Sequence, residues 1–312
     1  MPIKKRPRAI KMAPSRIFAL LILVALCWGL NWPVGKLLLR DLPPLWAVCL
    51  RSAAGTAALL LLCLVRRRLV IPKRADLPVV LSVGVLHMAI FSALVSVGLQ
   101  FVTAGRSVVL AYTTPIWVLP GAYLLLGERA GWPRVAGALL GIAGLLVLFD
   151  PRHFAWHDPR ALGGNALVLA AALFWAFSIL YIRAHKWVTP PFELTFWQAL
   201  LATVLLVPVA WAMDGPPPTA VPARALGLLL YGGVFGIAIA YWALTTVNRA
   251  VSSSTTSIGL LLVPVFGLAC SWLLLGERPD LGLLGAAALI LAGVALGTLR
   301  RSPAALPMHR NG

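Results

Sequence analysis

Acidic residues are scarce in this sequence: nine of its 312 residues are Asp or Glu, and charged residues of both signs make up 12%. Soluble domains carry about 25% charged residues. None of the nine lies in the middle of a long apolar run. This argues against a proton relay or sodium site built from buried carboxylates. The sequence also lacks an intramembrane Asp pair and a His-Glu-x-x-His motif, which weakens an enzyme interpretation.

Cysteine is a second scarce residue type. The sequence has four cysteines, and none forms a Cys-x-x-Cys motif or has the spacing of a metal site. All four lie within apolar runs, where a free cysteine behaves as a small hydrophobic packing residue. We therefore predict neither a metal site nor a cofactor. The four residues are Cys27, Cys49, Cys63 and Cys270.

Apolar residues, by contrast, are abundant and lie in long blocks. They make up 60% of the chain, and the mean hydropathy is +0.90. About 20 apolar residues in a helix span the hydrocarbon layer of a bilayer, and a helix satisfies its own backbone hydrogen bonds there. The sequence therefore predicts an all-α integral membrane protein with ten transmembrane helices. We expect these helices at 17–39, 44–65, 77–99, 104–125, 132–149, 163–184, 191–213, 224–246, 252–275 and 281–299.

The 27 Lys and Arg residues concentrate in short segments between the apolar blocks. With a cytoplasmic N-terminus, 19 of them lie inside and 7 outside, and Arg51 lies within a span. This asymmetry predicts a multi-pass protein of the inner (plasma) membrane with both termini in the cytoplasm. A basic chain can also bind nucleic acid, but the placement of these charges between apolar blocks argues against that partner.

The chain contains an internal repeat of five predicted helices. Because five is odd, the two copies insert with opposite orientation, a construction that many secondary transporters use around a substrate site at the midplane. We expect a cytoplasmic segment 1–16, a first repeat 17–149, an outer linker 150–162, a second repeat 163–299 and a cytoplasmic tail 300–312. Matching residues are Tyr123–Arg129 with Trp272–Arg278 and Pro115 with Pro264, at an offset of 149, and Trp28 with Trp175 and Arg51 with Gln198, at an offset of 147.

Three groups of residues in the first repeat are Gly105-Arg106-Ser107, Tyr112-Thr113-Thr114-Pro115 and Leu126-Gly127-Glu128-Arg129. Together with their echo from Ser252 through Pro264 to Gly276-Glu277-Arg278, they resemble the signature of EamA-type transporters of the drug/metabolite transporter (DMT) superfamily. This resemblance covers about 18–299 and implies ten helices, two repeats and export or exchange of metabolites such as amino acids.

The second repeat departs from the first at two places. Gln198 replaces the arginine, and Gly259-Leu260-Leu261 stands where the first repeat has Leu110-Ala111-Tyr112. Any role of Arg51 or Tyr112 is therefore confined to one half. The pairs Glu128-Arg129 and Glu277-Arg278 each permit two interpretations, a gate salt bridge or a turn-capping pair.

Aromatic residues with a few polar neighbours are the candidate substrate-binding residues. Trp28, Asn31 and Trp32 share one helix face by their i, i+3, i+4 spacing. A cavity lined by such residues offers apolar walls with a few polar tips, which suits an amphipathic solute. The alternative for each residue is a space-filling role between helices. The full candidate set is Trp28, Asn31, Trp32, Arg51, His87, Phe91, Tyr112, Trp117, Trp175, Ser178 and Tyr241.

Two of these candidates are ionisable and have open alternatives. His87 lies deep in the third span, where it could couple transport to protons, bind substrate or only bond a neighbouring carbonyl. Arg51 lies roughly 10 Å into the second span at 1.5 Å per residue. It could contact a substrate carboxylate or serve as a structural partner of helix-end carbonyls.

We therefore expect a secondary-type transporter of a small organic metabolite, such as an amino acid or related compound, working outward by alternating access. Export of drugs or other amphipathic compounds is the alternative within this class. A non-transporting sensor or lipid-modifying enzyme is the alternative from another class. The expected partners are the substrate and the lipid bilayer, and the choice between monomer and homodimer stays open.

Overall fold

The computed structural model describes residues 12–127, 131–150, 156–186, 188–248, 250–251, 256 and 259–298. The tail predicted at 300–312, most of the segment 1–16, and Glu128 with Arg129 lie outside these residues. Within them the chain is helical, and no strand is present. The predicted all-α membrane fold is thus confirmed.

Each predicted span corresponds to one helix or to a run of consecutive helices. Seven of these runs are long and apolar enough to cross a membrane, and three shorter apolar helices accompany them. The first repeat contains α1 (Pro14–Leu38), α2 (Pro44–Val65), η1 (Arg74–Asp76), α3 (Leu77–Ser82), η2 (Val83–Phe91), α4 (Ser92–Gly98), α5 (Ala104–Ala111), α6 (Thr114–Leu126) and α7 (Trp132–Leu148). The second contains α8 (Pro159–Ala184), α9 (Pro191–Asp214), α10 (Ala223–Leu230), η3 (Tyr231–Ile239), α11 (Ala240–Asn248), α13 (Leu262–Leu275) and α14 (Leu281–Thr298).

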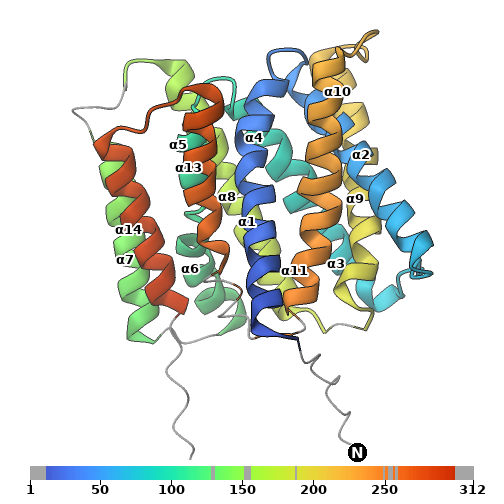
Figure 1. Cartoon of the computed structure of the whole chain (residues 1–312). Helices are drawn as coiled ribbons and strands as arrows, with labels where there is room; N and C mark the ends of the chain where they lie inside the picture. The colour runs from blue at the N-terminus through green and yellow to red at the C-terminus, as the bar shows by residue number, and fades with distance from the viewer. Residues whose placement is uncertain are drawn as a thin grey trace, which may run out of the picture.

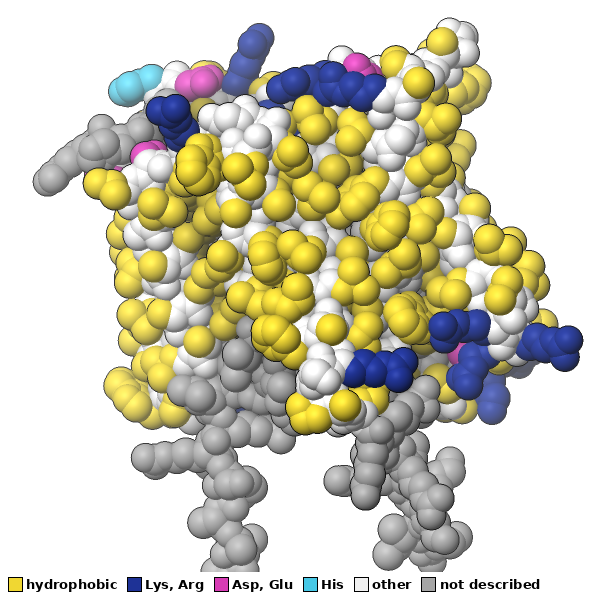
Figure 2. Space-filling model, viewed as in Figure 1, with side chains coloured by type: hydrophobic (Ala, Val, Ile, Leu, Met, Phe, Trp, Pro, Cys, Tyr) yellow, Lys and Arg dark blue, Asp and Glu magenta, His cyan; other side chains and the backbone are white. Residues whose placement is uncertain are grey.

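The helices form one bundle, and α1 begins at the same end of it at which α14 finishes (Figure 1). Hydrophobic side chains cover the middle of the face shown in Figure 2, whereas the Lys, Arg, Asp and Glu side chains lie toward its two ends. Large apolar residues such as Leu124 and Leu273 are three-quarters exposed. This apolar exterior is the one that a lipid environment favours, so lipid rather than water is the partner of the outer helix faces.

Proline and glycine set many of the helix limits. Proline opens α1, α2, α8 and α9, where its fixed φ and missing N–H fit the first helical position. Gly127 follows α6 with φ 64°, and Gly276 follows α13 with φ 70°. Both glycines adopt the left-handed conformation that ends a helix without a Cβ penalty. They occupy matching positions of the repeated Leu-Gly-Glu-Arg motif, so both copies end their helix in the same way.

The last helices of the two repeats, α7 and α14, pack side by side (Figure 1). A Cβ on Gly137 would collide with the carbonyl oxygen of Gly293, and a Cβ on Gly293 would collide with that of Gly137. Further along, a Cβ on Gly144 would lie 2.9 Å from the carbonyl oxygen of Ala286. Because residue numbers rise along α7 as they fall along α14, the equivalent helices are antiparallel. This is the relation expected between inverted repeats.

The two repeats also share the same irregularities. The third helix of each contains a nine-residue π-helical stretch, η2 in the first repeat and η3 in the second. The fourth span of the first repeat breaks at Tyr112 and Thr113, between α5 and α6, next to Pro115. Leu261, which is 149 residues beyond Tyr112, lies in a turn directly before α13. π-Helical segments and broken helices place free backbone groups where they line a cavity.

Candidate functional site: a central cavity

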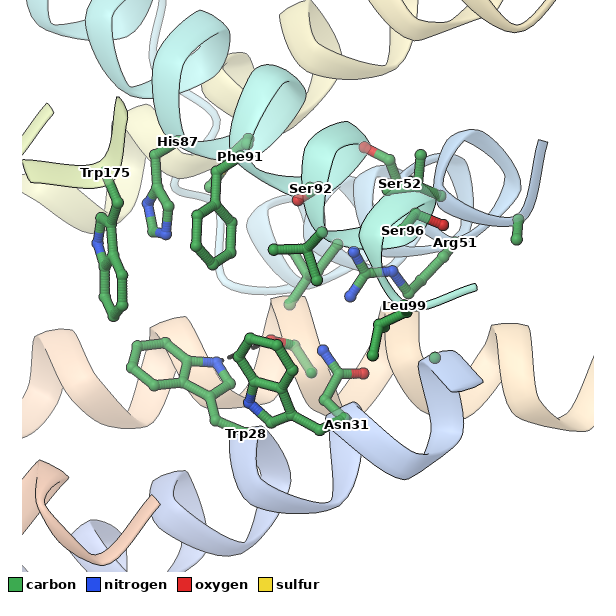
Figure 3. Close-up of a pocket in the computed structure, with 18 of the residues that line it drawn as sticks. Trp28, Asn31, Arg51, Ser52, His87, Phe91, Ser92, Ser96, Leu99 and Trp175 are labelled. Atoms are coloured by element: carbon green, nitrogen blue, oxygen red, sulfur yellow. Dashed lines mark hydrogen bonds between the residues drawn. The ribbon is translucent and has the colours of Figure 1, made fainter. Parts of the chain in front are cut away.

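A cavity lies in the centre of the bundle, between the two repeats (Figure 3). Its volume is about 150 Å³. The first repeat supplies residues of α1, α2, η2 and α4, and the second supplies residues of α8, η3, α11 and α13. A pocket at the junction of two halves, with mostly apolar walls and a few polar groups, has the features of a small-molecule site.

One end of the cavity is a cluster of aromatic rings. His87 stacks on Trp175, with ring centroids 5.2 Å apart and an interplanar angle of 6°. Phe91 approaches the His87 ring edge-on at 5.4 Å, and Tyr112 approaches Trp175 in the same way at 5.8 Å. These geometries are the ones that ring quadrupoles favour. The cluster is therefore a wall held by mutual contact, and it presents ring faces and edges to the cavity.

Two hydrogen bonds beside this cluster join residues of the first repeat to residues of the second. The Nε1–H of Trp28 donates to the carbonyl oxygen of Gly236 at 3.0 Å. Gly236 belongs to the π-helical stretch η3, whose altered hydrogen-bond register makes carbonyls available to side chains. The Oη of Tyr241 lies 3.4 Å from Nδ1 of His87, and the donor depends on the histidine tautomer. Trp28 and Tyr241 are themselves in edge-to-face contact at 5.6 Å.

The other end of the cavity is polar. Figure 3 shows Arg51 and Asn31 there, on the side away from Trp175 and His87. The aliphatic stem of Arg51 packs on Gly232 of η3, where a Cβ would lie 2.7 Å from Cδ of the arginine. The Oδ1 of Asn31 is buried and has no hydrogen-bond partner among the described residues. No Asp or Glu is among the described residues that line the cavity.

Nine of the eleven candidate residues predicted from the sequence line this cavity. Trp117 and Ser178 do not. Trp117 lies on α6 beyond the helix break, and its Nε1 donates to Oγ1 of Thr113 at 3.3 Å. Ser178 is fully buried within α8, and its Oγ has no partner among the described residues. The nine that line the cavity are Trp28, Asn31, Trp32, Arg51, His87, Phe91, Tyr112, Trp175 and Tyr241.

Sequence reasoning missed several lining residues because they are small or aliphatic. The η2–α4 segment carries His87 and Phe91, and it also supplies Met88, Ser92 and Ser96 to the cavity. These three residues could have been predicted by following the same helix face from one turn to the next. Gly236 and Ile237 carry no chemical signal in the sequence, because they line the cavity through the π-helical backbone of η3.

Polar contacts close the bundle at the end nearest Arg51. The Nζ of Lys36 donates to the carbonyl oxygens of Leu99 and Val102. The two carboxylate oxygens of Glu277 accept hydrogen bonds from the backbone N–H groups of Ala104 and Gly105, each at 3.0 Å. Glu277 thus caps α5, a helix of the other repeat, which neither sequence interpretation anticipated. Leu99 lines both the central cavity and a second pocket on the Lys36 side, so it separates the two.

At the opposite end of the bundle, a buried carboxylate connects two parts of the chain by hydrogen bonds. Asp76 precedes α3, and its Oδ1 lies 2.9 Å from Nε2 of His185. The backbone N–H of Val188 donates to Oδ1 at 3.2 Å, and that of Thr189 donates to Oδ2 at 2.8 Å. These bonds connect the third helix of the first repeat to the α8–α9 connection. Asp76 has a structural role here, away from the cavity.

The chain is similar to known proteins in sequence and in structure. The model of the EamA-like transporter family matches residues 15–150 and 162–299. The uncharacterized transporter YoaV of Bacillus subtilis (strain 168) is 27% identical over 278 residues, covering 89% of this chain and 95% of its own. A probable terminal-alkyne amino-acid exporter of Streptantibioticus cattleyicolor is 30% identical over 253 residues, covering 77% of this chain and 80% of its own.

Among solved structures, a crystal structure has the same fold. It matches with a TM-score of 0.63 at 22% sequence identity, over 91% of this chain and 96% of the other. The arrangement of the described helices is thus one that an experimental structure also has.

Proposed function

Because the chain belongs to the EamA-like transporter family, we propose that it moves a small organic metabolite across the membrane by alternating access around the central cavity. The proposed cargo is an amino acid or a related compound, and the proposed direction is outward. The membrane is the inner membrane, with both termini in the cytoplasm, as the distribution of Lys and Arg favours.

One observation supports this proposal above the others. The cavity lies between two inverted repeats, and both repeats supply its walls. In secondary transporters with this construction, motion of one repeat against the other opens a midplane site to each side in turn. The aromatic and polar residues of the cavity are the groups that would contact the cargo there, and His87 is the proposed coupling group.

The names of relatives support the direction and the cargo. The relative from Streptantibioticus cattleyicolor is named as an amino-acid exporter. Export of drugs or amphipathic compounds remains the alternative outcome of the experiment below. No feature of the described cavity residues favours a sensor or a lipid-modifying enzyme, and the two relatives described above are named as a transporter and an exporter.

Flux measurements in proteoliposomes test the proposal. Vesicles containing the purified protein are loaded with labelled amino acids, both aromatic and small polar, and efflux is followed with and without a pH gradient. We expect selective efflux of some members, and we expect Trp175→Ala to abolish it, because that ring forms part of the cavity wall.

Trp132→Ala is the matched control, since Trp132 is 74% exposed on α7 and lies away from the cavity. Equal loss of flux in both variants would contradict the assignment of the cavity as the transport site. Absence of amino-acid efflux from folded protein would shift the cargo to drugs or other metabolites.

A further inference from the structure

The central cavity has two chemically different ends. Aromatic rings, including His87 and Trp175, form one end, and Arg51 with Asn31 forms the other (Figure 3). A solute that fills such a cavity therefore has an apolar body and a polar head. The sign of charge that the head must carry follows from the groups around Arg51.

Arg51 lines the cavity as a cation whose guanidinium has no partner among the described residues. No hydrogen bond or ion pair joins its guanidinium to a described residue, and no described acidic residue lines the cavity. Other cations of the bundle have partners. Lys36 bonds two backbone carbonyls, and Arg106 bonds Asn165 and the carbonyl oxygen of Leu148. A lone cation in the membrane interior is costly, so a bound anion would stabilise it.

The backbone of η3 gives the Arg51 and Asn31 side chains their places. At Gly232, an added Cβ would lie 2.7 Å from Cδ of Arg51 and 3.3 Å from Oδ1 of Asn31. An added Cβ would force the Arg51 side chain to shift, so glycine at this position lets both side chains occupy the same end of the cavity. The two polar groups are packed into place rather than extended freely, so they form a fixed recognition surface for the head of a solute.

We propose that the cavity selects organic anions: one carboxylate binds Arg51, and an apolar or aromatic body lies against the ring cluster. This proposal rests on the proposed transport function and specifies the charge of the cargo. A guanidinium suits a carboxylate because it offers parallel N–H donors in a planar fork. Since no described lining residue is acidic, the cavity offers no counter-charge to an amine. An amino group on the solute is thus not required, and a cation without a carboxylate is disfavoured.

Three compounds that share a phenyl ring separate these properties. 3-Phenylpropionate carries only a negative charge, phenylalanine carries both charges, and phenethylamine carries only a positive charge. Binding to the purified protein is measured by quenching of tryptophan fluorescence, because Trp28 and Trp175 line the cavity. We expect 3-phenylpropionate to bind at least as tightly as phenylalanine, and phenethylamine to bind at least about tenfold more weakly.

Variants of Arg51 test the residue itself. Arg51→Gln should weaken binding of 3-phenylpropionate about 10- to 100-fold, the loss expected when a charged hydrogen-bond partner is removed. It should leave the neutral analogue 3-phenyl-1-propanol nearly unchanged. Arg51→Lys keeps the charge without the planar fork and should retain part of the affinity. Arg40→Gln is the matched control, because Arg40 is exposed and lies outside the central cavity.

The outcomes separate the two proposals. Phenethylamine binding as tightly as 3-phenylpropionate would overturn the inference and leave the transport function standing. The inference would also fail if phenylalanine bound tenfold more tightly than 3-phenylpropionate, since the amino group would then be recognised. If no compound bound or crossed the membrane with protein of native helix content, the assignment of the cavity as an amino-acid-type site would itself be wrong.

Discussion

The carboxylate of Glu277 stabilises one end of the bundle, and its replacement by glutamine gives a measurable prediction. Its two oxygens accept the N–H groups of Ala104 and Gly105, at the start of α5. These N–H groups have no acceptor within their own helix, because the first turn of any helix lacks one. The negative charge also lies at the positive end of the α5 dipole.

The magnitude follows from these contacts. A hydrogen bond to a charged group contributes about 1.5–3 kcal/mol, and a favourable charge at a helix terminus adds about 0.3–1 kcal/mol. Glu277→Gln keeps one acceptor oxygen but turns its NH₂ group toward an N–H donor. It therefore loses one of the two bonds together with the charge, and we expect a loss of about 2–4 kcal/mol in the free energy of unfolding.

Denaturation with sodium dodecyl sulfate in mixed micelles, followed by far-UV circular dichroism, measures this loss. Glu193→Gln is the control, because Glu193 pairs with Arg68 at 3.4 Å in an ion pair that is half exposed on the arginine side, with the Arg68 side chain 52% and the Glu193 side chain 13% exposed. Exposed ion pairs contribute about 0–1 kcal/mol. If Glu277→Gln destabilised the protein no more than Glu193→Gln does, the capping role of Glu277 would be refuted.

Three further predictions concern other parts of the bundle. Gly137→Ala should destabilise the protein by about 1–3 kcal/mol, because the added Cβ would collide with the Gly293 carbonyl oxygen. Gly163→Ala is the control, and it should be neutral or stabilising because the space around Gly163 is open. Thermal unfolding measures the stability of both variants. Asp76→Asn should cost about 3 kcal/mol in the same assay, since one oxygen that accepts N–H groups becomes a donor; a loss below about 1 kcal/mol would contradict this. His87→Ala should abolish pH-gradient-driven flux while part of the substrate exchange remains; equal loss of both would exclude a coupling role.

The positions of the helices could be predicted from the sequence because hydropathy and turn residues both mark them. The predicted span 44–65 coincides with α2, and 191–213 differs from α9 by one residue. The π-helical stretches η2 and η3 could not be predicted, since a change from i+4 to i+5 hydrogen bonding leaves composition and hydropathy unaltered. The role of Glu277 was also hidden, because its partners lie 172 and 173 residues away and are backbone groups.

Part of the cavity lining could be predicted because residues at i, i+3 and i+4 share a helix face. This spacing placed Trp28, Asn31 and Trp32 together, and all three line the cavity. Ser178, the candidate three residues after Trp175 on α8, does not line the cavity, because its side chain is fully buried between packed helices. A helix face therefore predicts which residues neighbour one another, whereas their exposure to a cavity depends on what the facing helix presents.

The contact between α7 and α14 has the form of an isologous dimer interface within a single chain. Gly137 meets Gly293, and the counterparts of these two residues at an offset of 149, Ala286 and Gly144, also meet. In a dimer of identical chains one substitution would alter both symmetric contacts, whereas in a single chain each contact can change on its own; here Ala286 faces Gly144 at the position where Gly137 faces Gly293. Both contacts keep a small residue on each side, so the two helix backbones approach closely along this seam. By contrast, Arg51 of the cavity lining corresponds to Gln198 in the other repeat. The seam thus keeps small residues in both repeats, whereas the cavity lining differs between them.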